Sequence, residues 1–301
     1  MSVTDILQQS FPQKDAHKAI SMPIYATAAF EFDTAEDMED AFLGKSGKHT
    51  YSRITNPTVE AFEDRIKTAS GAPAVTAVAS GMAAITDVFM AVAYAGANIV
   101  TSPHLFGNTF SLLYFTLKEF GVEARFCDIT NLQDIESKID SNTCCVFTEI
   151  ISNPHLEVAD VAALSKVAHS KGVPLIIDTT LIPWSHFKAG TSGVDIEVVS
   201  STKYISGGAT SIGGLILDYQ TFDWSCSPRL GAMSKVMGKR AFHVKIRSEI
   251  SRNIGAVMAP QTAYLQNLGL ETLELRYRAT SQKCLQLAQF LETVPTISKV
   301  S

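Results

Sequence analysis

The sequence is poor in cysteine and lacks the spacings in which cysteine and histidine commonly bind metal ions. Its 301 residues include five cysteines, an odd number without a C-x-x-C pair, and seven histidines without an H-E-x-x-H pattern. Neither a disulfide framework nor a metal site is expected from them. The amino terminus shows no charged segment followed by an apolar one. We therefore expect a cytoplasmic chain with reduced thiols.

The sequence also lacks an excess of positive charge and an uninterrupted apolar run. With a formal net charge of −5 at pH 7, it has no broad basic field, so nucleic acid and anionic membranes are not expected partners. The longest apolar stretch, from Ala83 to Val100, contains Asp87 and Asn98 and falls short of the roughly 20 apolar residues of a membrane span. With 46% hydrophobic and 18% charged residues, the chain should instead fold around a large core.

The first sixty residues have no sustained hydrophobic period. Prolines and glycines are scattered among short apolar pieces, which predicts an extended arm over 1–60. Regular structure is expected to begin at Asn56-Pro57, because asparagine caps helices and proline suits their first turn, and this helix should run to Gly71. We expect a large domain over 61–255 and the start of a smaller one over 256–301.

Short apolar or β-branched runs alternate with helical patterns along the rest of the chain. The predicted strands are Ala74–Ala79, Asn98–Thr101, Glu123–Phe126, Thr143–Thr148, Val173–Ile177 and Ile196–Val199, and helices are predicted at Asp160–Lys171 and Glu271–Leu291. This alternation predicts an α/β fold, a mostly parallel sheet with helices on both faces. Ligands bind beyond the carboxyl ends of the strands in such sheets, so the residues just past each strand are the candidates for a site.

The turn Ser80-Gly81-Met82 follows the first predicted strand and opens a helix. The free backbone N–H groups at the positive end of a helix dipole suit a phosphate. Many strand-to-helix turns of this composition bind nothing. The phosphate interpretation therefore depends on what the other strand ends bring to the same edge.

Asp178 and Phe106 follow two other predicted strands. Asp178 ends an apolar run, where a carboxylate is costly unless it has a partner such as a protonated ring nitrogen. It could equally cap the next loop. Phe106 would offer a stacking surface to an aromatic cofactor, or it would belong to the core.

Lys203 is the sharpest candidate, because it follows a predicted buried strand and is flanked by hydroxyls and glycines. Such a lysine could be a desolvated amine that forms a Schiff base, with Ser200 and Thr202 binding a phosphate. The alternative is a solvated loop lysine. A nucleotide site is not expected, since no G-x-G-x-x-G follows the first strand and no G-x-x-x-x-G-K-[ST] occurs.

Together, a phosphate-binding turn, an aromatic plate, a carboxylate for a ring nitrogen and a Schiff-base lysine describe a pyridoxal-phosphate site. Their order matches a family: over about residues 20 to 301 the chain resembles the Cys/Met-metabolism pyridoxal-phosphate enzymes of the transsulfuration group. The motifs that carry the resemblance are Tyr51-Ser52-Arg53, Asn56-Pro57-Thr58, Ser80-Gly81-Met82-Ala83-Ala84, Glu149 with Asn153-Pro154, Asp178, and Ser200-x-Thr202-Lys203-Tyr204. Within the group, two segments are most similar to the O-acetylhomoserine sulfhydrylase branch, Thr210–Gly214 and Gly269–Arg276.

The resemblance implies fold type I, the fold of aspartate aminotransferase, with a mostly parallel seven-stranded sheet, and pyridoxal 5'-phosphate as the cofactor. Residues 61–255 would be the cofactor domain. Lys203 would hold the cofactor as a Schiff base, Asp178 would keep its pyridine nitrogen protonated, and Asn153 would hydrogen-bond its ring hydroxyl. Phe106 would stack on the ring, and Lys203, Asp178 and Phe106 would be the catalytic residues.

The resemblance also assigns the phosphate contacts. They would come from the turn after the first strand and from two hydroxyls: Ser80, Gly81, Met82, Ser200 and Thr202. Tyr51 and Arg53 would complete them from a neighbouring subunit, which gives the irregular arm a purpose. A site shared in this way makes a homodimer the minimum unit, and a tetramer is usual for the family.

The implied reaction is a γ-replacement on an amino-acid substrate. Lys203 would act as base at Cα, and the preferred substrate is O-acetyl-L-homoserine, which reacts with sulfide or a thiol to give homocysteine or methionine and acetate. Methionine γ-lyase and cystathionine γ-synthase or γ-lyase activities are the alternatives on the same scaffold.

Three features depart from the family pattern. Phe106 stands where the family usually has a tyrosine, so stacking is kept but a hydroxyl acid is lost, which favours a good leaving group such as acetate. Thr179 replaces the usual asparagine. Family members continue well beyond residue 301 and place the arginine for the substrate carboxylate there, so the small domain is expected to be truncated. A cofactor-binding chain that does not complete the reaction is therefore a further alternative.

Overall fold

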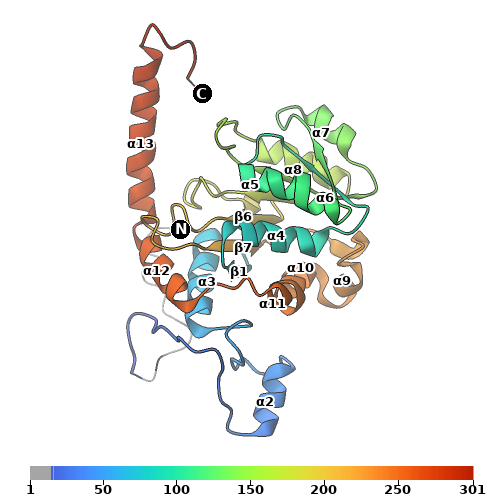
Figure 1. Ribbon diagram of the computed structural model, residues 1–301, viewed down its shortest axis with the longest axis vertical. Coiled ribbons are helices and arrows are strands. Elements are labelled where there is room, and N and C mark those ends of the chain that lie inside the picture. Colours follow the sequence, from blue (N-terminus) through green and yellow to red (C-terminus); the bar gives the residue numbers. More distant parts are fainter. Residues whose placement is uncertain (1–14, 16, 301) are drawn as a thin grey trace.

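The computed structural model describes Asp15 and residues 17–300, and its centre is one seven-stranded sheet (Figure 1). The strands are β1 Ala74–Val78, β2 Asn98–Thr101, β3 Glu123–Phe126, β4 Thr143–Glu149, β5 Leu175–Asp178, β6 Ile196–Val199 and β7 Gly214–Asp218, in the order β1-β7-β6-β5-β4-β2-β3. Only β7 runs antiparallel to its neighbours; the pairs from β6 across to β3 are parallel. The mostly parallel α/β sheet is confirmed.

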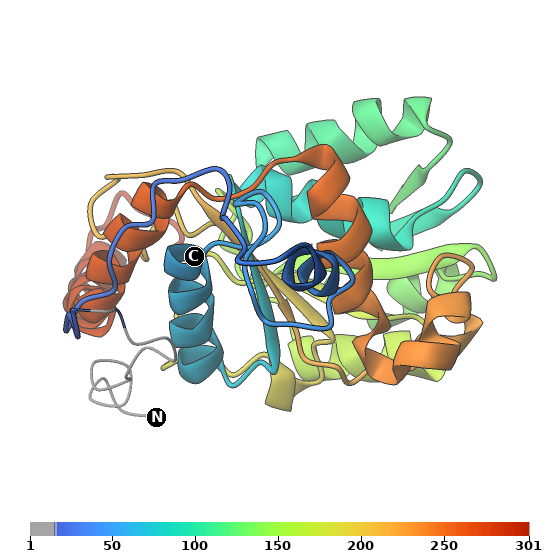
Figure 2. The ribbon, with the colours of Figure 1, turned by 90° about the horizontal axis from the view of Figure 1, so that it is seen from below.

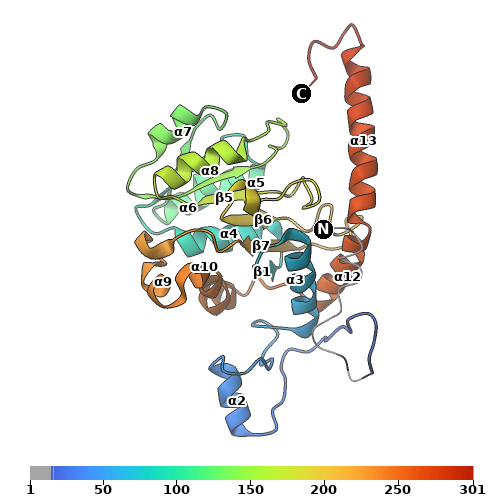
Figure 3. The ribbon, with the colours of Figure 1, turned by 180° about the vertical axis from the view of Figure 1, so that it is seen from behind.

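Helices cover both faces of the sheet, as Figures 1 and 3 show from opposite sides. One apolar core joins the sheet to α3 Pro57–Ser70, α7 Leu132–Lys138, α8 Val161–Ser170 and α12 Pro260–Glu271. A second core lies on the other face, against α4 Gly81–Val92, the π-helical turn Leu112–Thr116, α6 Leu117–Glu119 and α10 Ala241–Lys245. Inside the sheet, β5 and β7 are buried on both faces, and their residues 175–177 and 215–217 are continuous apolar runs rather than alternating ones.

The capping chemistry of α3 explains why this helix was predictable. The Asn56 side chain accepts a hydrogen bond from the backbone N–H of Thr58, and Pro57 occupies the first helical position. At the other end Gly71 has a φ of +80°, a left-handed conformation that favours glycine. The predicted helix start and end are both confirmed.

Over residues 17–56, the described stretch that precedes α3, the chain is mostly irregular but forms a helix that the sequence pattern did not predict, α2 Ala35–Phe42. The Thr34 hydroxyl caps it by accepting from the N–H of Asp37 at 3.0 Å. Figures 1 and 3 show α2 standing apart from the two helical layers, and in the view from below in Figure 2 it lies in front of them. Residues 1–14 and 16 of the predicted arm lie outside the described residues.

At the other end of the chain, α13 Leu273–Glu292 extends away from the sheet (Figure 1). Its bounds differ from the predicted helical run by two residues at the start and one at the end. Leu273 is its one buried residue, and several apolar side chains farther along are exposed, among them Leu285 and Phe290. None of the described helices is both long and apolar enough to cross a membrane.

Candidate active site

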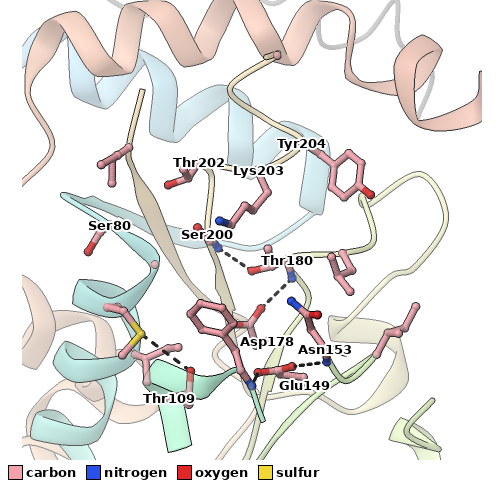
Figure 4. Close-up of a pocket in the computed structure, with 18 of the residues that line it drawn as sticks. Ser80, Thr109, Glu149, Asn153, Asp178, Thr180, Ser200, Thr202, Lys203 and Tyr204 are labelled. Carbon is pink, nitrogen blue, oxygen red and sulfur yellow. Dashed lines mark hydrogen bonds between the residues drawn. The ribbon is translucent and has the colours of Figure 1, made fainter. Parts of the chain in front are cut away.

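A cavity of about 950 Å³ lies where the parallel strands end (Figure 4). Its walls come from the turns that follow β1, β2, β4, β5 and β6, and from the first turns of α13. Nine of the eleven predicted site residues line it: Ser80, Gly81, Met82, Phe106, Asn153, Asp178, Ser200, Thr202 and Lys203. The ends of the parallel strands thus bring together residues that are up to 123 positions apart in the chain, from 80 to 203, as expected for this kind of sheet.

Tyr51 and Arg53 are the two predicted residues that do not line this cavity. They border a separate groove together with Phe42 and Arg252. The Arg53 guanidinium lies over the Tyr51 ring, 5.4 Å from its centroid. Within this chain they are therefore apart from the other nine.

The turn Ser80-Gly81-Met82 is pressed against the end of β6. The Ser80 hydroxyl caps α4 by accepting from the N–H of Ala83 at 3.0 Å, and the first N–H groups of the helix have no acceptor within it. A Cβ added to Gly81 would lie 2.6 Å from the Cβ of Ser200. Glycine is needed here because the two turns approach too closely for a side chain, and together they form a cup of N–H and hydroxyl groups.

Thr202, the second predicted phosphate-binding hydroxyl, also shapes its own loop. Its Oγ1 donates to the carbonyl of Gly213 at 3.1 Å and accepts from the N–H of Gly213 at 3.0 Å. These bonds hold the turn after β6 against the residue that precedes β7. The hydroxyl keeps one further lone pair as an acceptor, but its proton is already used within the chain.

Asp178, the last residue of β5, presents its carboxyl to the cavity. Burial raises its pKa above the usual range of an aspartate, and a hydrogen bond from the N–H of Thr180, at 2.8 Å, works in the opposite direction. A cation beside the carboxylate would offset the cost of its burial. The Thr180 hydroxyl in turn accepts from the N–H of Ser200 at 2.8 Å, so it joins the ends of β5 and β6.

Lys203 lies in the turn after β6, with its side chain exposed to the cavity. Its backbone N–H donates to the carbonyl of Ser200 at 3.2 Å. Among the described residues its amine makes no hydrogen bond or ion pair, and Figure 4 shows it on the same side of the cavity as Ser200. The amine is thus available to a bound molecule.

Two cavity residues have roles that the sequence did not reveal. Glu149 ends β4 and accepts hydrogen bonds from the backbone N–H groups of Phe106 and Asn153. Arg276, from the first turns of α13, also lines the cavity and donates to the carbonyl of Gly269 at 2.7 Å. Both residues occur in motifs that supported the resemblance, but only the fold places their side chains at the site.

The donor set fits pyridoxal phosphate. A phosphate would meet the N–H and hydroxyl cup, and the pyridine nitrogen would meet the Asp178 carboxyl. Phe106, 43% exposed, offers a free ring face, and Lys203 supplies the free amine that a carbonyl carbon requires. The residues present therefore fit this group. Among the described residues no cluster of side chains has the composition to hold a metal ion.

Comparisons with known proteins agree with this fit. The family model for Cys/Met metabolism PLP-dependent enzymes matches residues 4–301. The homocysteine/cysteine synthase of Saccharomyces cerevisiae is 34% identical over 97% of this chain and 69% of its own length. The O-acetyl-L-homoserine sulfhydrylase of Corynebacterium glutamicum is 34% identical over 94% of this chain and 68% of its own length.

Two solved structures are similar as well. An O-acetylhomoserine sulfhydrylase of Wolinella succinogenes is 45% identical and has a TM-score of 0.77 over 83% of this chain and 72% of its own. A putative O-acetylhomoserine (thiol)-lyase of Campylobacter jejuni, 31% identical, has a TM-score of 0.88 over 98% of this chain and 76% of its own, and it contains N'-pyridoxyl-lysine-5'-monophosphate. The chain belongs to the family of Cys/Met metabolism PLP-dependent enzymes, and its cofactor is pyridoxal phosphate.

Proposed function

We propose that this chain catalyses a γ-replacement in which O-acetyl-L-homoserine and sulfide give homocysteine and acetate, with a small thiol giving methionine or another thioether instead. The observation that carries the proposal is the convergence of Lys203, Asp178 and Asn153 on one cavity. Relatives of this chain named as homocysteine synthases or O-acetylhomoserine sulfhydrylases support the choice of substrate.

The chain's own residues divide the work. The N–H groups of Gly81 and Met82 and the Ser200 hydroxyl would bind the phosphate, and the Thr202 hydroxyl would join them once its proton turns from the Gly213 carbonyl. Asp178 would pair with the pyridine nitrogen, and Asn153 would bind the ring hydroxyl. Bound pyridoxal phosphate acts as an electron sink that stabilises negative charge at Cα and Cβ of an amino acid. Lys203 first anchors the cofactor and then, as a free amine, takes the proton from Cα.

Phe106 influences which leaving group the site can expel. Its side chain lines the cavity but has no hydroxyl, so it cannot protonate a departing atom. Acetate leaves readily without protonation, whereas a thiolate benefits from an acid. This favours O-acetylhomoserine over the γ-elimination of methionine or cystathionine.

The family resemblance gives the substrate carboxylate to a different arginine, but in this chain we assign it to Arg276, which lines the cavity. Besides Lys203 it is the one cationic side chain that lines the cavity in the described part of the chain. Two of its five N–H donors bind Gly269 and Thr272, which orients the guanidinium and leaves the other donors for a carboxylate.

Tyr51 and Arg53 are assigned to the phosphate of a neighbouring subunit. Their distance from this chain's own cavity and the 40% exposure of Tyr51 support a dimer as the minimum unit, and we propose a tetramer as its assembly. We also propose a cytoplasmic location, which agrees with five cysteines that form no disulfide.

Turnover by the cofactor-loaded chain tests the function. With sulfide present, O-acetylhomoserine should yield equal amounts of homocysteine and acetate, and O-succinylhomoserine and methionine should react more slowly. Faster turnover of methionine would replace this proposal with a γ-lyase. A chain that binds the cofactor but converts none of the three substrates would be the cofactor-binding alternative.

A further inference from the structure

Glu149 is a buried carboxyl at the cavity that the reaction outlined above does not use. It is the last residue of β4 and is 7% exposed. Its Oε1 accepts from the backbone N–H of Phe106 at 2.6 Å, and its Oε2 accepts from the backbone N–H of Asn153 at 3.3 Å. Figure 4 shows the carboxyl of Glu149 beside Asn153 and below Asp178.

The two residues it joins belong to different loops. Phe106 lies in the loop that follows β2, and Asn153 lies in the loop that follows β4. Both side chains line the cavity, one as the stacking surface and the other as the partner of the ring hydroxyl. We propose that Glu149 is a positioning residue, whose carboxylate ties these two loops together and so fixes the spacing of the two side chains that contact the cofactor ring. The proposal rests on the cofactor roles given to Phe106 and Asn153 above.

The chemistry of the contact requires a carboxylate of this length. Each N–H needs an acceptor oxygen, and only an ionised carboxyl has two oxygens without a proton. Glutamine would turn an NH2 group toward one of the N–H donors, and aspartate is one methylene shorter. Burial, and to a smaller degree the neighbouring Asp178, raise the pKa of Glu149 to about 7, while the two backbone N–H groups favour the charged form. The contact should therefore weaken as the pH falls below about 7, because protonation removes one of the two acceptor oxygens.

A second link between the same loops lies beyond the cavity residues. His104 and Glu157 pair through Nδ1 and Oε2 at 2.8 Å, and the His104 ring stacks on His155 with centroids 4.2 Å apart. Neither His104 nor Glu157 lines the cavity. Glu157→Gln is therefore a matched control, because it alters a glutamate that joins the same loops without contacting Phe106 or Asn153.

The test uses the full chain and pyridoxal phosphate without an amino-acid substrate, so a failure of the sulfhydrylase proposal would not affect it. The dissociation constant of the cofactor and its visible circular dichroism per bound molecule are measured for Glu149→Gln, Glu149→Asp and Glu157→Gln, with the Tm of each cofactor-free chain. We expect Glu149→Gln to weaken binding about tenfold or more and to reduce the dichroism, because a hydrogen bond to a charged group is lost.

Glu157→Gln should stay within about twofold of the unchanged chain, a difference smaller than one ordinary hydrogen bond. Glu149→Asp should lie between the two and carries the test if Glu149→Gln does not fold. A merely structural role would lower Tm and leave both cofactor measurements unchanged. That result, or an equal effect of Glu157→Gln, would overturn the proposal.

Discussion

In the proposed function, individual side chains at the cavity determine which amino acid is converted. Lys203 and Asp178 line the cavity and would supply what any reaction of this cofactor needs, whereas Phe106 and Arg276, which line it too, would influence the choice of substrate. Because Phe106 has no hydroxyl, this side chain cannot protonate the leaving group. The guanidinium of Arg276 could bind the carboxylate of the amino acid. Both assignments can be tested with single substitutions.

Phe106→Tyr should add the missing hydroxyl. We expect methionine elimination to rise on the order of tenfold or more, because the hydroxyl can protonate the departing thiolate, while O-acetylhomoserine turnover stays within about threefold. Release of 2-oxobutyrate from methionine measures the change. Phe115→Tyr is the control, since Phe115 is 60% exposed and does not line the cavity. Unchanged methionine turnover in Phe106→Tyr would contradict the assignment.

Arg276→Gln should raise KM for the amino-acid substrate by about tenfold or more, because a charge-assisted hydrogen bond to the carboxylate is lost. The affinity for pyridoxal phosphate should change little. Arg278→Gln is the control, because Arg278 is on the same helix but binds Glu274 and is 61% exposed. If KM were the same in both variants, another group would bind the carboxylate.

At this scale the sequence was informative where a residue type was chemically unusual for its position. A carboxylate at the end of an apolar strand is costly without a partner, so Asp178 was recognisable. Lys203 was recognisable by the hydroxyls and glycines that flank it after a predicted buried strand. Arg276 was not, because it reaches the cavity only through the packing of α12 and α13, about seventy positions farther along. Tyr51 and Arg53 followed from the resemblance alone, and their roles stay predictions.

At the scale of elements, the site depends on the close approach of two turns. The start of α4 and the end of β6 meet at Gly81 and Ser200, and β7 closes in from the side, where a Cβ on Gly214 would lie 2.0 Å from the Ser80 carbonyl oxygen. The cup of N–H and hydroxyl groups exists because no side chain separates these elements. A substitution that separates these two turns should therefore also weaken the binding of a phosphate between them.

Gly81→Ala should disturb that cup. Because its new Cβ would meet Ser200, we expect a loss of about 1–3 kcal/mol in unfolding free energy and at least about tenfold weaker binding of pyridoxal phosphate. Denaturant unfolding and a cofactor titration measure the two effects. Gly47→Ala is the control, since nothing lies within 4 Å of a Cβ there. Wild-type cofactor affinity in Gly81→Ala would show that the two turns can separate without cost.

Several elements were predictable because their local signals agree with their environment. β2, β3 and β6 have the predicted bounds, and α3 has both of its caps. The antiparallel direction of β7 was not predictable, since an apolar run carries no information on direction. The short helix α2 was missed because eight residues capped by one threonine form no sustained period.

At the scale of the whole molecule, we expect each phosphate site to be formed by residues of two subunits. Tyr51 and Arg53 follow α2 in the chain and border a groove with Met38 and Phe42 of that helix, rather than the chain's own cavity. If they serve a neighbouring subunit, two differently damaged chains should repair each other. Such repair requires that the two variants form mixed dimers or tetramers.

Mixing inactive Lys203→Ala with inactive Arg53→Ala should restore activity, because a hybrid dimer contains one site with both residues intact. Random pairing puts about half of the dimers in the hybrid form, so about a quarter of the wild-type activity is expected. The two variants are unfolded and refolded together, and each refolded alone is the control. A mixture no more active than its parts would place Arg53 outside any shared site.

The proposed function requires that the cavity beyond the strand ends binds pyridoxal phosphate and that Lys203 anchors the cofactor there. Borohydride reduction of the loaded chain, followed by peptide mapping by mass spectrometry, tests it most directly. We expect one reduced pyridoxyl phosphate per chain, on the peptide that contains Lys203, and none in Lys203→Ala. A label on another lysine, or one that persists in Lys203→Ala, would contradict it.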